Sequence, residues 1–167
     1  TGNRKLEGNT LCNLGMLHLL QGRLDEAEAA SRAALVLARE LGLVDLTPWD
    51  VGVKGRFPQP TPLLQVADRL GQLTGMQPLV HQGGLDHVET VILVSGSGTG
   101  LLPKVDADLF VTGEPKHSVF HETFERGLNV IYAGHYDTET FGVKALAAHL
   151  EARFGLPWVF LDHPTGL

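Results

Sequence analysis

Apolar residues in the second half of the chain fall in short runs, separated by polar or glycine-rich segments. Each run predicts a strand, at Val88–Val94, Leu109–Val111, Leu128–Ala133 and Trp158–Leu161. The patterns between them predict helices over a short segment to about Val105, over Lys116–Arg126 and over Thr140–Phe154. The strands are apolar almost throughout, which is typical of a parallel sheet covered on both faces. The alternation predicts an α/β fold with a mostly parallel sheet and flanking helices.

The first forty or so residues follow a helical pattern instead. Apolar residues recur there in two stripes separated by Gly22, at Leu11, Leu14, Leu17 and Leu20, and then at Ala27, Ala30, Ala34, Leu37 and Leu41. The pattern predicts an N-terminal α-helical hairpin over residues 1–42, followed by an α/β domain over residues 43–167.

A connector from Leu43 to Pro62 joins these two parts. Trp49, Val51 and Val53 alternate with other residues and are compatible with a short strand. The prolines of Phe57–Pro62 exclude a continuous helix. After the connector, a helix is predicted from Leu63 to Gly75 and a strand over Leu79–His81.

Composition excludes several classes of protein. A net charge of -6 over 167 residues argues against binding nucleic acid by phosphate neutralisation. The first ten residues are polar, and no apolar run approaches the roughly 18 residues of a membrane span, so neither a signal peptide nor a membrane segment is expected. The single Cys12 excludes an intrachain disulfide, and we expect a cytoplasmic protein.

Candidate chemistry gathers where three strands end. Gly134–Glu139, Ser95–Gly98 and Thr112–Glu114 each follow a predicted strand. In a parallel sheet the carboxyl ends of the strands meet at one edge, where ligands bind. We call these three loops the rim and expect them to converge.

His135 and Glu139 are the strongest candidate pair in the rim. Imidazole and carboxylate together suit a divalent ion such as Zn, Mn, Fe or Ni. The alternative is structural, with Glu139 in the first turn of a helix for dipole reasons. Glu114 has the same alternative, and the pair His117 and His121, one helical turn apart, is either a metal pair or part of a solvated helix.

The loop Ser95, Gly96, Ser97 and Gly98 leaves two interpretations open. Its glycines would let the backbone approach a ligand, and free amides at a helix start attract anions. A tight structural turn explains the same residues. The loop has neither the Walker pattern nor the dinucleotide fingerprint.

The N-terminal segment resembles one tetratricopeptide repeat. The resemblance rests on Leu11-x-x-Leu14-Gly15-x-x-His18, Gly22-Arg23-Leu24-Asp25-Glu26-Ala27 and Ala34-Leu35. One repeat cannot bury its own apolar face, so we expect it to dock on the rest of the chain or on another copy. The resemblance also implies a peptide partner as a weaker alternative.

The rest of the chain, from about residue 36 to 167, resembles the C-terminal part of the Nif-three-like family, also called GTP cyclohydrolase 1 type 2. The resemblance rests on four motifs in order, Ser95–Gly98, Asp106–Glu114, Lys116-His117 and Gly134–Glu139. It implies an α/β fold with a dinuclear metal centre, and toroidal hexamers built from dimers. His135 and Glu139 match family metal ligands, Glu139 as a bridge, and Glu114 matches a residue lining the same cavity.

The family's other ligands are a His-His pair and an Asp in the N-terminal half, and this chain has no His-His pair. We therefore expect a truncated or chimeric metal-binding domain, joined within one helix over residues 24–42. Its incomplete site would bind an ion weakly or not at all, without full hydrolase activity. The alternative is a non-catalytic chimeric scaffold or an interaction module that uses the hairpin. Self-association is expected in either case.

Overall fold

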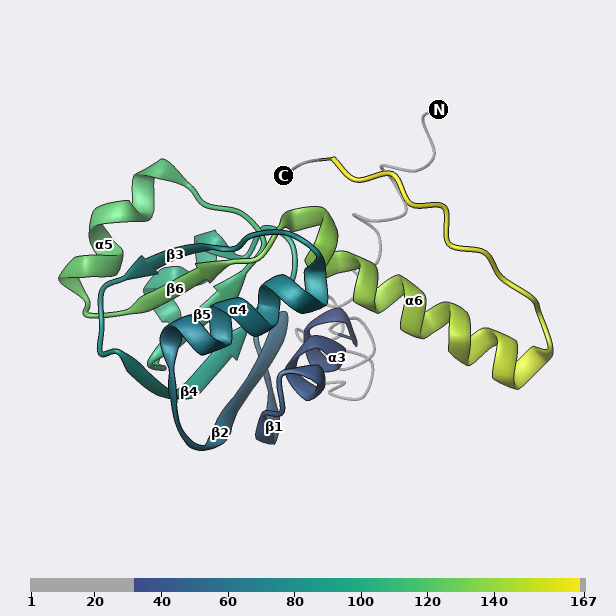
Figure 1. Ribbon diagram of the computed structural model, residues 1–167, viewed down its shortest axis with the longest axis horizontal. Helices are drawn as coiled ribbons and strands as arrows, with labels where there is room; N and C mark the ends of the chain where they lie inside the picture. The colour runs from purple at the N-terminus through teal and green to yellow at the C-terminus, as the bar shows by residue number, and fades with distance from the viewer. Residues whose placement is uncertain (1–31, 166–167) are drawn as a thin grey trace.

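The computed structural model describes residues 32–165, which form a six-stranded sheet in the order β1-β2-β4-β5-β6-β3 with helices around it (Figure 1). The strands are β1 (Val44–Trp49), β2 (Gly52–Pro62), β3 (Leu79–Gln82), β4 (His87–Leu93), β5 (Leu109–Thr112) and β6 (Asn129–Tyr132). The helices are α3 (Arg32–Glu40), α4 (Leu63–Thr74), α5 (Phe120–Glu125) and α6 (His135–Phe154), with 3-10 turns η1 (Thr99–Lys104) and η2 (His117–Val119). None of the helices in this part of the chain is long and apolar enough to cross a membrane.

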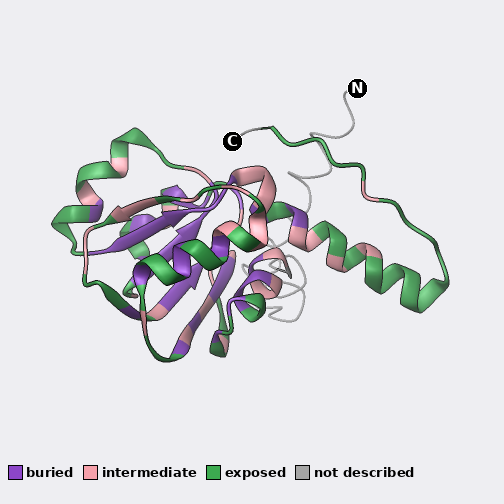
Figure 2. Cartoon of the chain, in the orientation of Figure 1, coloured by how far each residue is buried: buried purple, intermediate pink, exposed green. Residues whose placement is uncertain are grey.

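The centre of the sheet is parallel, as predicted. β4 pairs with β5, and β5 pairs with β6, each in parallel register. All residues of β5 and β6 are buried, because apolar side chains point to both faces (Figure 2). Leu93, Val111 and Ile131 face α3 and α4, whereas Ile92, Phe110 and Val130 face η1 and η2.

The sheet as a whole is not mostly parallel, and that prediction was wrong. Three of its five strand pairings, β1–β2, β2–β4 and β3–β6, are antiparallel. The difference comes from the connector, which forms a hairpin of two strands. Pro58 and Pro60 lie in a stretch of β2 that has no register partner in β1 or β4, so their missing N–H groups cost no ladder hydrogen bond.

The predicted last strand, Trp158–Leu161, was also wrong. The residues after α6, 155–165, contain neither helix nor strand; we call them the C-terminal segment. They run back along α6 toward its beginning (Figure 1). Side chains hold them there: Trp158 Nε1 donates to Glu151 over 3.0 Å, and Tyr136 donates its hydroxyl to Asp162 over 2.8 Å.

The predicted hairpin lies outside the described residues up to position 31. Its end forms α3, which passes through residue 36 without a break. α3 packs against α6 where Gly142 meets Ala33: a Cβ on Gly142 would lie 3.0 Å from the Cβ of Ala33. The absence of a side chain at Gly142 therefore allows the two helices to approach closely.

Asp108 ties the amino ends of β4 and β5 together. Its Oδ2 accepts the amides of Glu89 and Thr90 over 3.0 and 2.8 Å, and the hydroxyl of Thr90 over 2.8 Å. Burial raises the pKa of the Asp108 carboxyl, but these hydrogen bonds outweigh it and leave the pKa below its ordinary value. The ionised carboxylate therefore contributes to stability at neutral pH.

We expect Asp108→Ala to lower the free energy of unfolding by about 1–2 kcal/mol at pH 7. A lowered pKa means that the contribution is present above the ordinary Asp pKa and is lost as the pH falls through the folded-state pKa. The gap between parent and variant, measured by urea unfolding, should therefore close below about pH 4. Asp68→Ala on the exposed side of α4 is the control, and a gap for Asp108→Ala that persisted at low pH would contradict this explanation.

Candidate metal centre

The three rim loops lie side by side at the carboxyl edge of the parallel strands. The amide of Gly113 donates to the carbonyl of Gly96 over 2.8 Å, and the amide of Gly134 donates to the carbonyl of Gly113 over 3.0 Å. These bonds continue the hydrogen-bond pattern of the sheet beyond the strands themselves. The structure thus brings together the loops that the sequence placed at strand ends.

Two fully buried threonines hold the loops to one another. Thr112 Oγ1 accepts the Gly98 amide over 2.9 Å and donates to the Gly96 carbonyl over 3.1 Å. Thr138 Oγ1 accepts the Gly96 amide over 2.9 Å and donates to the Gly134 carbonyl over 2.8 Å. Each hydroxyl acts both as donor and as acceptor. The sequence analysis did not predict that Thr112 and Thr138 would join the loops. The sequence showed only that each of them lies beside glycines of the rim.

His135 and Glu139 face each other at the beginning of α6. The helix begins at His135, earlier than the predicted start at Thr140, so the two residues are one turn apart on one side of the helix. His135 Nε2 lies 3.4 Å from Glu139 Oε1. Gly134, with φ of +87°, makes the turn from β6 into the helix, a conformation that suits glycine.

Glu114 holds the other side of the His135 ring. Its Oε2 lies 3.1 Å from His135 Nδ1. Hydrogen bonds from Ser97 and then from His135 hold the pKa of Glu114 below its usual range, so this carboxylate is ionised at neutral pH. An ionised carboxylate only accepts hydrogen bonds, so His135 donates from Nδ1. In the neutral ring the Nε2 lone pair then points toward Glu139.

Gly96 lets the Glu139 carboxylate and the His135 ring come close to the backbone of its loop. Its φ is +66°, and a Cβ there would overlap with Oε1 of Glu139 and lie 3.2 Å from His135 Nε2. A side chain at position 96 would therefore push the Glu139 carboxylate away from the imidazole. The glycine is needed for both its conformation and its small size.

The other candidate residues are less involved. Ser97 reaches Glu114, whereas Ser95 and Gly98 belong to the same loop, and in residues 32–165 no side-chain hydrogen bond joins Ser95 to the pair. His117 is exposed on η2, and in residues 32–165 the structure shows no contact between it and His135 or Glu139. Three of the four motifs therefore supply one cluster, made by Ser97, Glu114, His135 and Glu139.

The cluster offers two metal ligands rather than three. In the described part of the chain, no three His, Cys, Asp or Glu side chains are grouped so that they could hold one ion. Glu114 and Glu139 approach different nitrogens of the His135 ring, so they do not converge. The side chains of Glu139 and His135 are the ones nearest to the place that a Cβ on Gly96 would take.

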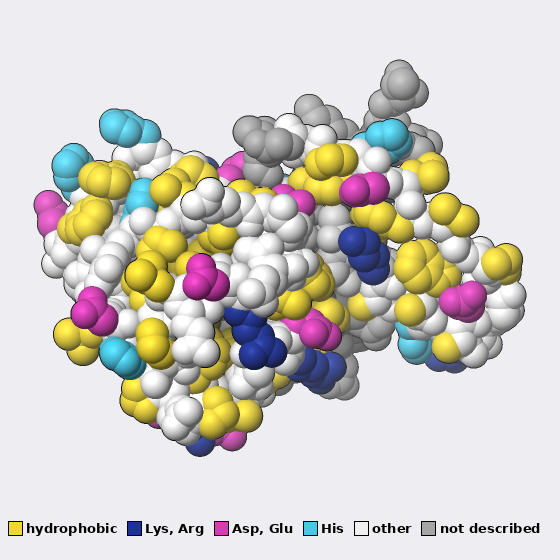
Figure 3. Space-filling model, in the orientation of Figure 1, with side chains coloured by type: hydrophobic (Ala, Val, Ile, Leu, Met, Phe, Trp, Pro, Cys, Tyr) yellow, Lys and Arg dark blue, Asp and Glu magenta, His cyan; other side chains and the backbone are white. Residues whose placement is uncertain are grey.

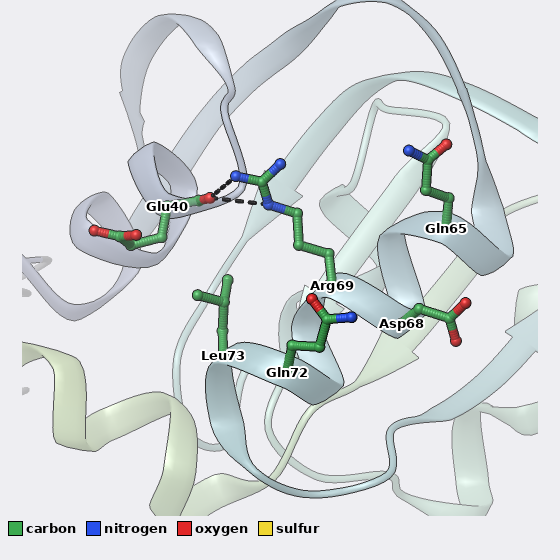
Figure 4. A pocket seen from close by; sticks show the side chains of 6 residues that line it. All are labelled: Glu40, Gln65, Asp68, Arg69, Gln72 and Leu73. Carbon is green, nitrogen blue, oxygen red and sulfur yellow. Dashed lines mark hydrogen bonds between the residues drawn. The ribbon is translucent and has the colours of Figure 1, made fainter.

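A separate surface pocket of about 530 Å³ lies between the end of α3 and α4 (Figure 4). It is lined by Glu40, Gln65, Asp68, Arg69, Gln72 and Leu73. Arg69 donates from Nε and Nη2 to the carbonyl of Glu40 over 3.1 and 2.6 Å, which satisfies a carbonyl at the end of α3. The pocket shares no residue with the rim, and its arginine serves the structure of the helix end.

Together, the fold and the rim define a three-layer α/β protein with a histidine–carboxylate pair at the carboxyl ends of its parallel strands. A family model agrees with this description: the model for Duf34/NIF3 (NGG1p interacting factor 3) matches residues 18–165. The chain belongs to this family. The match begins before residue 36, where the sequence motifs had placed the start of the resemblance, and so includes part of the segment predicted as a hairpin.

Relatives and solved structures agree with the family. A GTP cyclohydrolase 1 type 2 homolog of Deinococcus radiodurans is 49% identical over 141 residues, 79% of this chain and 54% of the relative. A homolog of the same name from Pyrococcus horikoshii is 39% identical over 120 residues, 70% of this chain and 48% of the relative. The crystal structure of TTHA1606 from Thermus thermophilus superposes with a TM-score of 0.77 and 98% identity, covering 81% of this chain and 56% of that one. The chain thus spans about half the length of the relatives it matches.

Proposed function

We propose that this chain forms part of a Nif3-type metal centre, in which His135 Nε2 and Glu139 bind one divalent ion. The name of its relatives, GTP cyclohydrolase 1 type 2 homolog, suggests a hydrolase, but the chain spans only about half of their length. With two ligands, it would hold an ion weakly and would lack full hydrolase activity.

The observation that carries the proposal is the arrangement around His135. A metal-binding histidine almost always donates its other ring N–H to a carboxylate, a carbonyl or water, which fixes the tautomer and the ring. Glu114 stands in that position at Nδ1, while Nε2 faces the Glu139 carboxylate across 3.4 Å. A lone pair facing a carboxylate is a repulsive contact unless a proton or a metal ion lies between them, so this geometry suits either an ion pair of His135 with Glu139 or a bound cation.

The donor types favour a borderline divalent ion. One imidazole and one carboxylate suit Zn, Mn, Fe or Ni, as the sequence already suggested. Such an ion, when bound, supplies Lewis acidity. The protein's own residues would position the two ligands. Glu114 would orient the imidazole, Thr112 and Thr138 would hold the loops together, and Gly96 would allow Glu139 to lie close to His135. Water or a second chain would fill the remaining coordination positions.

Metal content after dialysis against Zn, Mn or Fe, measured by elemental mass spectrometry, tests the proposal. We expect about one ion per chain at high metal concentration, and an affinity lower by about 100-fold or more in His135→Ala and in Glu139→Ala. Glu114→Gln should lose about 10- to 100-fold, because it removes an orienting partner rather than a ligand.

His149→Ala provides the matched control, since His149 is exposed on α6 away from the rim. Its metal content should equal that of the parent. Equal trace metal in the parent and all variants would reject the proposal, and the chain would then be a non-catalytic scaffold.

A further inference from the structure

An exposed apolar stripe runs along α6. Val143, Leu146, Leu150 and Phe154 are exposed by 47, 37, 37 and 60%. At about 100° per residue, their spacing places all four within an arc of about 80° on one side of the helix. Contiguous exposed apolar surface of this kind marks a place where something binds. We call these four residues the α6 stripe.

The neighbouring sides of α6 already have partners. Gly142 contacts α3, and Phe141 packs against the hydrophobic core between the sheet and the helices α3 and α4. On the other side the C-terminal segment lies along the helix, with Lys144 Nζ 4.3 Å from the centre of the Phe160 ring. The α6 stripe lies between these two contacts. Hydrophobic side chains accordingly gather over α6 and the C-terminal segment in the space-filling view (Figure 3).

The described chain begins close to this stripe. Ala33, near the start of α3, touches α6 at Gly142, one residue before Val143. The 31 residues that precede α3 are therefore tethered beside the stripe. The family model includes the last of them, from residue 18, in the same unit as the sheet.

The preceding residues carry apolar side chains over a similar length. Leu11, Leu14, Leu17 and Leu20 recur at a spacing of three, and a helix over them would place these side chains along about 14 Å and over about 180° of its circumference. The α6 stripe extends over about 17 Å from Val143 to Phe154. Neither face can remain in water without cost, since each buried Leu or Phe side chain stabilises a protein by about 1.5–3 kcal/mol.

We propose that residues 1–31 of the same chain dock on the α6 stripe and cover it, with neighbouring leucines of the set Leu11, Leu14, Leu17 and Leu20 against Val143, Leu146, Leu150 and Phe154. Tethering favours this occupant over a second copy, because a short linker gives an effective concentration on the order of millimolar. The contact is independent of the metal centre and would stand if that proposal failed.

Cys12 provides the probe, because it is the only cysteine in the chain and lies in the proposed helix. A nitroxide attached there should broaden the amide signals of residues 143–154 in the full chain, and leave Thr90 at the far end of β4 sharp. Unbroadened α6 signals would overturn the proposal. In a mixture of spin-labelled unenriched protein and unlabelled ¹⁵N protein, broadening would assign the stripe to a second copy and would also overturn it.

A variant pair provides a second measurement. Leu146→Ser with Leu150→Ser should make tryptic cleavage after Arg23 about tenfold faster, because undocking exposes the segment. Leu64→Ser is the matched control, since Leu64 is a 65% exposed leucine on α4, and it should leave cleavage unchanged. Retained amide shifts for Val91, Phe110 and Ile131 would show that the sheet of the double variant is intact, and an unchanged cleavage rate in that intact protein would refute the docking.

Discussion

Gly113→Ala is expected to lower the free energy of unfolding by about 3 kcal/mol, because the added methyl group has no place to go. A Cβ at position 113 would lie 2.6 Å from the carbonyl oxygen of Gly96 and 2.6 Å from the Cα of His135. Both are backbone atoms, held by the hydrogen bonds that join the rim loops. Relief of the overlap therefore requires the loops to separate.

Urea unfolding followed by circular dichroism measures the loss. Gly100→Ala is the matched control, since a Cβ on Gly100 meets nothing within 4 Å, and it should change stability by less than about 1 kcal/mol. A Gly113→Ala protein as stable as the parent would mean that the three loops are not in contact. The proposed metal centre would then lose its structural basis.

The central strands were predictable because their side chains are apolar on both faces, so the strands must be buried in the middle of the protein. Val91–Val94 and Leu109–Val111 are uninterrupted apolar runs, and such runs require cover on both faces. Parallel strands have their carboxyl ends at one edge, so the convergence of the rim loops followed from the fold class alone. Both features depend on local pattern and a general rule of topology.

The direction of the outer strands was not predictable in the same way. β2 carries prolines that argue against a strand, and they are tolerated only because the register with β4 shifts between Arg56 and Thr61. For Trp158–Leu161 the prediction failed in the other direction, because the pattern suits a strand but none forms. These residues pair with no strand, and Trp158 instead donates a hydrogen bond to Glu151 on α6. Which strands pair depends on contacts between residues far apart in the sequence, and the local pattern of apolar residues does not reveal them.

The beginning of α6 shows what the site prediction lacked. The residue pattern predicted a helix from Thr140, whereas the structure begins it at His135. The Thr138 hydroxyl bonds to the Gly134 carbonyl inside the first turn, while Gly134 precedes the helix. This earlier start places His135 and Glu139 on one side of the helix. The identity of the pair was predictable, whereas its geometry depends on where the helix begins.

The arrangement also separates the roles of the two carboxylates. Glu114 is 30% exposed and bonded to the ring, whereas Glu139 is 54% exposed and faces open space. Sequence alone could name both as candidates without distinguishing them. The contacts of the two ring nitrogens make one an orienting residue and the other a candidate ligand.

Gly96→Ala is expected to weaken metal binding by about 100-fold or more while leaving the protein folded, because its methyl group would displace the Glu139 carboxylate from His135. That Cβ would overlap with the Glu139 carboxylate, whose exposed side chain can swing away from His135. The cost in stability is then mainly the left-handed backbone, about 1–2 kcal/mol.

Gly155→Ala separates these two effects, since Gly155 has the same φ of +66° and a Cβ there meets nothing within 4 Å. Both variants should lose a similar amount of stability in urea unfolding, but only Gly96→Ala should lose its metal in titration calorimetry. Equal metal affinity in the two would mean that the ion does not lie between His135 and Glu139. Loss of metal in Gly96→Ala alone, with the sheet intact, would show that the ion needs Glu139 close to His135, because backbone strain is matched and only the displacement of Glu139 differs.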